Sequence, residues 1–121
     1  MLIYIGFYKR KPGLSVEEFH RLWSEEYGPL YSTIPEVKRH VRRYVQHRLE
    51  NSEFDGFSEA WYDSAADREA MKAEPIYKEK VDPLVATFLD MENSRFGATD
   101  SQTYQIGEAP KLVRAITPKP D

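Results

Sequence analysis

The segment from Leu2 to Lys9 constrains the fold most, because its residues are apolar toward both sides of an extended chain. Most of it is β-branched or aromatic, which is typical of a strand: Ile3, Tyr4, Ile5, Phe7 and Tyr8. A strand that is apolar on both faces is normally covered on both faces. The sequence therefore predicts a sheet with helices on one side and a second layer on the other.

A helix is expected after the turn at residues 11–13, where proline and glycine stand together. Ser15 and Glu18 have the spacing of a capping box, so the helix should begin at Ser15. One side of it carries an apolar stripe: Val16, Phe19, Leu22, Trp23, Tyr27 and Leu30. Gly28 and Pro29 are expected to end or kink this helix.

The rest of the chain predicts three more strands and a second helix. Pro35 should close a linker before a strand from Arg39 to Leu49, and Gly56 to Tyr62 is its natural hairpin partner. A helix from Ala65 to Ala73, capped by Asp63 or Ser64, and a strand from Gln102 to Ile106 complete the order. This β-α-β-β-α-β order is the split βαβ, ferredoxin-like pattern of the α+β class.

The two faces of such a sheet must be covered in different ways. The connecting helices cover one face, and the apolar residues of the other face require a partner. Two copies packed sheet to sheet would satisfy that need, so we expect a homodimer. We expect one domain over residues 1–107 and an extended, proline-containing arm over residues 108–121.

Composition excludes several classes of function. The chain has no cysteine, which removes disulfides, thiolate metal sites and cysteine nucleophiles. Its net charge of -3 disfavours nucleic-acid binding, although a basic second strand keeps that as a third hypothesis. No apolar stretch is long enough to cross a membrane, and no basic leader precedes an apolar run, so we expect a cytoplasmic protein. Its three histidines lack metal-ligand spacing, and no phosphate-binding glycine loop is present.

Several short motifs, in this order and spacing, resemble the EthD family over about residues 2–107. They are the segment from Lys9 to Ser15, Glu17-Glu18-Phe19, Trp23, Gly28-Pro29-Leu30, Pro35, Arg43-Tyr44-Val45-Gln46, Asp55-Gly56, Glu59, Trp61 and Phe88-Leu89-Asp90. The resemblance implies a dimeric α+β barrel and a small aromatic, polyketide or lactone-like ligand. Relatives in that superfamily include isomerases, cyclases, lyases and monooxygenases that need no cofactor, and we expect no cofactor here.

Two positions depart from the family pattern. Many members carry a histidine in a His-x-Pro sequence at the end of the first helix, where this chain has Tyr27. Many also carry a histidine two places after the glutamine of the second strand, where this chain has Arg48. If those histidines are the family's acid-base groups, this chain lacks both.

The candidate catalytic residues are Tyr27, Tyr44 and His40. A phenol at Tyr27 could donate a hydrogen bond to a ligand oxygen, but an unperturbed pKa near ~10 makes it a poor base at neutral pH. Tyr44 is expected to share one face of the second strand with Gln46 and Arg48, because these positions are two residues apart. Arg42 and His40 continue the same spacing toward the start of the strand. His40 could serve as a general base. The alternative for each is a structural role, in the core for Tyr27 and at the surface for His40.

The candidate substrate-binding residues are Trp23, Gln46, Arg48, Trp61 and Phe88. Arg48 could hold a carboxylate or enolate oxygen. A charged edge strand that resists aggregation is the alternative for the arginines, and core packing is the alternative for the aromatic residues. Glu59 could pair with an arginine of the neighbouring strand, which we favour over a role as catalytic acid, and His47 could lie at the dimer interface.

Two functional hypotheses follow. The first is a cofactor-independent enzyme that binds a small metabolite between sheet and helices, oriented by Tyr27, Tyr44 and Gln46, and performs isomerisation, cyclisation, decarboxylation, dehydration or oxygenation. The second is a non-catalytic binding or accessory protein of a catabolic or biosynthetic pathway, which the missing histidines favour.

Overall fold

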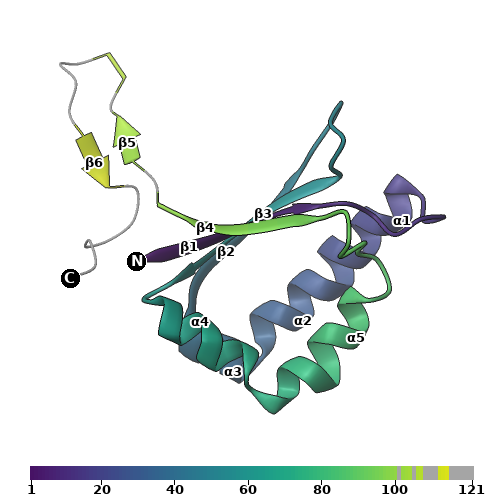
Figure 1. Cartoon of the computed structure of the whole chain (residues 1–121), viewed down its shortest axis with the longest axis horizontal. Coiled ribbons are helices and arrows are strands. Elements are labelled where there is room, and N and C mark those ends of the chain that lie inside the picture. The colour runs from purple at the N-terminus through teal and green to yellow at the C-terminus, as the bar shows by residue number, and fades with distance from the viewer. Residues whose placement is uncertain (101, 105, 108–111, 115–121) are drawn as a thin grey trace.

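The main sheet has four antiparallel strands in the order β2-β3-β1-β4 (Figure 1). The computed structural model describes residues 1–100, 102–104, 106–107 and 112–114. The strands of this sheet are β1 (Leu2–Tyr8), β2 (Val41–Arg48), β3 (Gly56–Tyr62) and β4 (Arg95–Thr99). This order is that of the split βαβ motif, so the chain has the predicted ferredoxin-like α+β fold.

The first helical segment is longer than predicted. It comprises α1 (Val16–Arg21), η1 (Leu22–Tyr27) and α2 (Gly28–Thr33). The Ser15 hydroxyl accepts a bond from the Glu18 N–H, which is one half of the predicted capping box, and the Glu18 carboxylate accepts from Arg21. The helix does not end at Gly28. Because η1 is π-helical and the Gly28 N–H donates to the Trp23 carbonyl five residues back, the turn widens just before Pro29, which has no N–H to donate.

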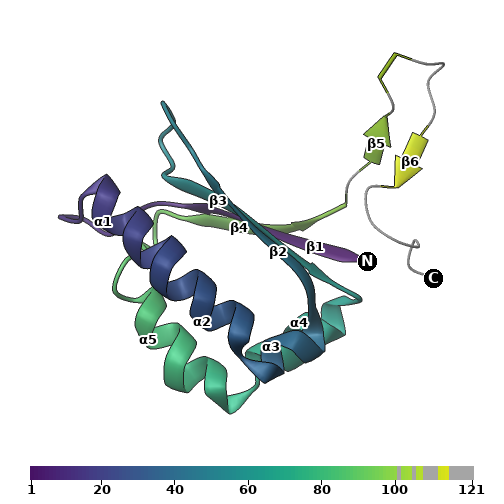
Figure 2. The same ribbon diagram turned by 180° about the vertical axis from the view of Figure 1, so that it is seen from behind.

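The remaining helices complete the layer beneath the sheet (Figures 1 and 2). They are α3 (Pro35–His40), α4 (Ala65–Lys72), η2 (Tyr77–Val81) and α5 (Asp82–Val85). Of the two expected caps of α4, Ser64 is used, since its hydroxyl accepts from the Asp67 N–H at 3.1 Å. Trp23, Phe19 and Phe88 are almost fully buried between sheet and helices, where they form the centre of the core.

The predicted start of the second strand at Arg39 is wrong. Pro35 begins the short helix α3 instead of closing a linker, and Arg39 and His40 are its last residues. A bulge between Val41 and Arg43 then shifts the strand by one residue, so Arg42 leaves the face expected for it and pairs with Asp63 at 2.8 Å. Proline at the first turn of a helix is favourable, and this local signal outweighed the alternation that suggested a longer strand.

The prediction that residues 102–106 form the fourth strand of this sheet is also wrong. β4 is Arg95–Thr99, which pairs with β1, whereas β5 (Gln102–Tyr104) pairs with β6 (Leu112–Arg114) in a separate two-stranded sheet. β4 contains Gly97 and only one large apolar residue, Phe96, so its strand propensity is weak. Of the predicted arm at residues 108–121, only 112–114 lie within the described residues, and these form β6.

No helix of the described residues lies against the other face of the sheet (Figures 1 and 2), and the strand pairing places apolar side chains on that face. We call this the outer face; it comprises Ile3, Ile5, Phe7, Arg43, Val45, His47, Phe57, Glu59 and Trp61. Glu59 pairs with His47 at 2.6 Å and not with an arginine as predicted. The Arg43 guanidinium lies 4.8 Å from the Trp61 ring centroid and helps to cover that ring.

Candidate functional site

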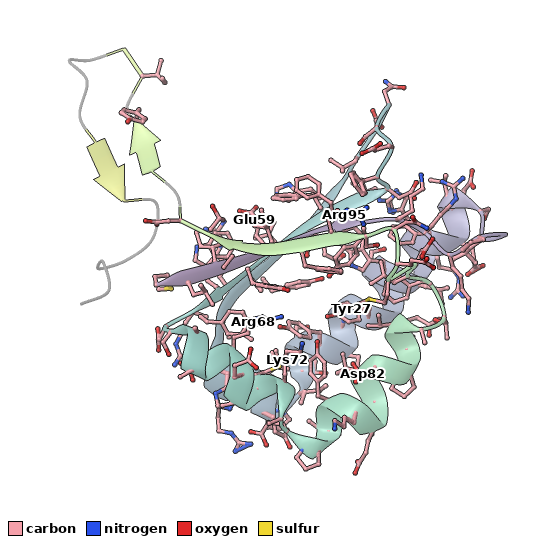
Figure 3. The ribbon with its side chains drawn as sticks, viewed as in Figure 1. Tyr27, Glu59, Arg68, Lys72, Asp82 and Arg95 are labelled. Carbon is pink, nitrogen blue, oxygen red and sulfur yellow. The ribbon has the colours of Figure 1, made fainter. Side chains whose placement is uncertain are left out.

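A cavity of about 190 Å³ lies between the inner face of the sheet and the helices beneath it. Strands β1, β2, β3 and β4 supply its roof, and α2, α4 and α5 contribute to its walls (Figure 3). Pockets for drug-sized molecules have volumes of roughly 300–1,000 Å³. This cavity is smaller, which suits a ligand of one or two rings.

Tyrosines dominate the lining. Seven of the eight tyrosines in the chain line the cavity, and they come from every layer that surrounds it: Tyr4, Tyr8, Tyr27, Tyr31, Tyr44, Tyr62 and Tyr77. Each has an apolar ring and a hydroxyl that can both donate and accept a hydrogen bond. The lining is therefore suited to an aromatic molecule that carries several oxygen atoms.

The local structure of each element brings these rings together. Tyr4 and Tyr8 are an even number of residues apart on β1, so both point to the inner face. Tyr27 and Tyr31 are four residues apart on one helical segment, and their rings stack with centroids 5.4 Å apart. A Cβ atom at Gly6 would lie 2.6 Å from the Tyr8 ring, so glycine is needed between the two strand tyrosines.

Burial determines the ionisation of the phenols. It raises the pKa of Tyr27, Tyr31 and Tyr44 well above the ordinary tyrosine value, because a phenolate would lose its hydration there. The same cause raises the pKa of Tyr8, Tyr62 and Tyr77. These six hydroxyls therefore remain protonated at neutral pH and act as neutral hydrogen-bonding groups.

Hydrogen bonds orient some of these hydroxyls, whereas others, that of Tyr27 among them, have no partner within the described residues. The Gln46 amide donates to the Tyr44 hydroxyl at 3.1 Å and to the Trp23 carbonyl at 3.0 Å, which holds Tyr44 in place. The Tyr31 and Tyr62 hydroxyls lie 3.4 Å apart. Within the described part of the chain, the Tyr27 hydroxyl has no hydrogen-bond partner, so it can donate to a ligand.

Three of the predicted site residues line the cavity, and two more support it from behind. Tyr27, Tyr44 and Phe88 are in the lining. Trp23 is 1% exposed and belongs to the core behind the cavity. Gln46 does not line the cavity but holds Tyr44 through its amide.

The other three predicted site residues lie elsewhere. His40 ends α3, where its ring nitrogens face Asp67 at 2.9 Å and Glu74 at 3.3 Å. Arg48 is an exposed residue at the end of β2. Trp61 is on the outer face, on the opposite side of the sheet from the cavity.

Sequence reasoning missed the charged residues of the lining and most of its tyrosines. Arg68 and Lys72 reach it from α4, and Asp82 from α5 (Figure 3). The spacing of Arg68 and Lys72, one helical turn apart, could have shown that they share a face. The high tyrosine content, with Tyr4 and Tyr8 on one face of the first strand, was the available signal for the phenol lining.

Two further properties concern the described residues. They contain no group of three or more His, Cys, Asp or Glu side chains placed to hold a metal ion. None of their helices is both long and apolar enough to span a bilayer.

Comparisons with known proteins identify the scaffold. The family model described as the EthD domain matches residues 11–92. A dimeric protein of unknown function and ferredoxin-like fold from Bacteroides fragilis superposes with a TM-score of 0.64 at 12% identity, over 81% of this chain and 93% of that one. No curated protein matched the chain.

Two other solved structures are similar to this chain. An EthD family protein from Bacillus halodurans gives a TM-score of 0.59 at 18% identity, over 80% of this chain and 96% of that one. SnoaB, a cofactor-independent oxygenase from Streptomyces nogalater, gives a TM-score of 0.60 at 12% identity, over 88% of this chain and 97% of that one. At sequence identities this low, the likeness shows a shared fold but not a shared activity.

Proposed function

The chain belongs to the EthD domain family, and from this premise we propose that it is a cofactor-independent enzyme acting on a small aromatic, polyketide or lactone-like metabolite. The family and the fold support a small-molecule role in general terms. The single observation that carries the proposal further is the cavity lined by seven tyrosines between sheet and helices. Stacking and phenol hydrogen bonds together recognise oxygenated aromatic rings.

The proposed roles of the phenols follow from their protonation. A phenol is already protonated at neutral pH, and burial raises the pKa of Tyr27 and Tyr44 further, so both are neutral donors. A neutral donor held in a site with little water stabilises the negative charge that develops on a carbonyl oxygen when an enolate forms. Isomerisation, cyclisation, decarboxylation, dehydration and cofactor-free oxygenation of such ligands all pass through an electron-rich oxygen of this kind.

A ligand screen tests the proposal. Thermal shift against aromatic polyketides, lactones and phenolic acids, with product analysis of every hit, should yield a stabilising compound that the protein converts. Y27F combined with Y44F should then slow turnover at least tenfold, since removing one donor to an oxyanion costs about 10²–10³ in kcat where the donor is well placed. Y104F, at an exposed tyrosine outside the cavity, is the matched control. Unchanged turnover in the double variant would contradict the assigned roles.

A non-catalytic binding protein is the second candidate, and two observations favour it. Tyr27 and Arg48 stand where many family members carry histidine, and the six phenols with raised pKa cannot act as bases at neutral pH. The same screen separates the candidates, because a binding protein would be stabilised by a ligand that is recovered intact.

We also propose that two copies of this chain pack outer face to outer face. Phe7, Phe57 and Val45 are half-buried on a face without helices, and the similar protein from Bacteroides fragilis is dimeric. Light scattering after size exclusion should give twice the chain mass of 14.2 kDa. Phe57→Arg should produce a monomer, whereas Glu17→Arg, on an exposed helix surface, should not. A monomeric native protein would refute this assembly.

A cytoplasmic location is part of the same proposal, in keeping with a chain without cysteine. Fractionation of the source cells tests it, and recovery of the protein outside the cytoplasmic fraction would contradict it.

A further inference from the structure

Three charged residues line the cavity: the cation Arg68 lies inside it, and the cation Lys72 and the anion Asp82 lie closer to solvent. The Arg68 side chain is only 16% exposed, whereas Lys72 and Asp82 are exposed residues of the lining. In Figure 3 the side chains of Arg68 and Lys72 extend from α4 into the space beneath the sheet, and Asp82 lies on the other side of that space. Two cations against one carboxylate leave the lining net positive.

Arg68 is held in place by an aromatic ring. Its guanidinium carbon lies 3.5 Å from the centroid of the Tyr4 ring, a stacked arrangement that fixes the plane of the guanidinium. Tyr4 is on β1 and Arg68 is on α4, so this contact spans the cavity from roof to wall. The guanidinium is therefore oriented before any ligand arrives.

The hydrogen-bonding capacity of Arg68 is largely unused. Its one ion pair joins Nη1 to a Glu69 carboxylate at 3.1 Å, and the Glu69 side chain is 73% exposed. A guanidinium has five N–H donors, and within the described part of the chain no other acceptor pairs with them. Partial burial of a cation is costly without a partner. An anionic group on a ligand would supply that partner.

Lys72 extends the positive character toward solvent. It lies one helical turn after Arg68, so both side chains lie along the same face of α4. Among the described residues it forms no ion pair or hydrogen bond. A cation at this position attracts an anionic ligand toward the deeper arginine.

We infer that the ligand carries a carboxylate on its aromatic body, and that Arg68 is the residue that selects it. This inference rests on the proposed function and deepens it, because it names the charge of the substrate. Arg68 binds the two carboxylate oxygens, since the planar guanidinium matches their geometry. The ring system then extends along the tyrosine lining toward Tyr27 and Tyr44, where the phenols bind its other oxygens. Asp82, a carboxylate at the exposed edge of the lining, disfavours a second negative charge there.

Matched acids and esters test this assignment in the full-length protein. We would titrate benzoic, salicylic and 3-hydroxy-2-naphthoic acids and their methyl esters by calorimetry at neutral pH. At least one acid should bind, and at least tenfold more tightly than its ester, because hydrogen bonds between charged groups are the strong ones. Each ester keeps the ring system and any ring hydroxyl of its acid, so the ratio isolates the contribution of the charge.

Variants then locate the selectivity. Arg68→Met should bring acid and ester affinities within about threefold of each other while leaving ester affinity near that of the native protein. Arg68→Lys should keep part of the preference, and Arg39→Met, at an exposed arginine of α3 outside the cavity, should keep all of it. The native comparison stands even if Arg68→Met fails to fold.

The outcomes separate this inference from the proposed function. Equal binding of acid and ester by the native protein, or an acid preference that survives in Arg68→Met, would overturn the role of Arg68 while the aromatic cavity stands. Absence of binding by every acid and every ester would refute the aromatic ligand itself, and the inference with it.

Discussion

Gly56 is the position where adding a single methyl group should reveal how tightly the core behind the site is packed. A Cβ atom there would lie 2.6 Å from Cζ3 and 2.7 Å from Cη2 of Trp23, distances at which one group must move. Trp23 is 1% exposed and packs against Phe19 and Tyr8, so its ring has little freedom to shift. Gly56→Ala should therefore overpack this core.

The size of the effect follows from two opposing contributions. Overpacking a core costs about 1–3 kcal/mol, and replacing glycine by alanine in the unfolded chain returns about 0.4–1 kcal/mol. The central values of the two ranges leave a net loss of about 1.3 kcal/mol in the free energy of unfolding, within limits of about 0 to 2.6 kcal/mol. For a chain of this length that corresponds to a Tm lower by roughly 3–10 °C.

Gly97→Ala is the matched control, because Gly97 is also a strand glycine and a Cβ there would meet no atom within 4 Å. Its Tm should remain the same or rise slightly. Differential scanning calorimetry of the three proteins at one concentration gives the comparison. The packing argument would be refuted if Gly56→Ala were as stable as Gly97→Ala.

Gly56→Ala should also affect ligand binding at the candidate site. The Trp23 carbonyl accepts a bond from Gln46, and Gln46 holds the Tyr44 hydroxyl. Displacing the Trp23 ring should disturb this chain of contacts, so Gly56→Ala should weaken ligand binding, whereas Gly97→Ala should not.

Three further predictions concern stability and the site. Burial raises the pKa of six cavity tyrosines, so the stability they contribute is complete below the unfolded pKa of about 10 and is lost as pH rises toward their folded pKa values. In an alkaline titration, their phenolate absorbance should therefore appear at the pH at which circular dichroism shows unfolding. Ionisation of these phenols near pH ~10 in the folded protein would contradict this. Asp55→Asn should cost about 1–3 kcal/mol in chemical denaturation, because this 8% exposed carboxylate accepts from the Arg10 side chain at 2.7 Å and from its backbone N–H at 2.9 Å. Asp63→Asn, at an exposed pair, should change stability little, and equal losses would count against the burial argument. Gln46→Leu should lower ligand affinity about three- to tenfold, because it removes the N–H that donates to the Tyr44 hydroxyl. Gln46→Glu should lower it at least as much, since an ionised carboxylate can donate neither to the Tyr44 hydroxyl nor to the Trp23 carbonyl. Variants that bind as tightly as the native protein would show that Gln46 does not position Tyr44.

Local patterns in the sequence predicted most elements correctly. The capping residues Ser15 and Ser64 begin their helices as expected, because a cap needs only residues a few positions away. The hairpin of β2 and β3 and the class of the fold also followed from alternation and order. β4 was missed because its five residues have weak strand propensity and are held in the sheet by pairing with β1.

The candidate site was predictable only in part. Tyr27 and Tyr44 reach the cavity because they lie on the inward side of elements whose periodicity the sequence displays, whereas Phe88 enters it from the turn that follows α5. Trp61 has the same strand period but faces outward, because alternation shows that two faces exist without showing which one meets the helices. His40 was misplaced because proline at position 35 begins a helix and a bulge follows it.

The amino-acid sequence by itself determined the periodicities, the caps, the absence of thiol chemistry and the resemblance to a family, all of which depend on residues close together in the chain or on their order. Only the tertiary structure decided that seven tyrosines from β1, β2, β3, the first helical segment and η2 share one cavity, and that Arg68 of α4 stacks on Tyr4 of β1 inside it. The cavity brings together residues as far apart in the sequence as Tyr4 and Tyr77, and the Arg68 contact joins α4 to the first strand, so the geometry depends on strand order, register and helix docking. Those quantities are set by the packing of the whole chain.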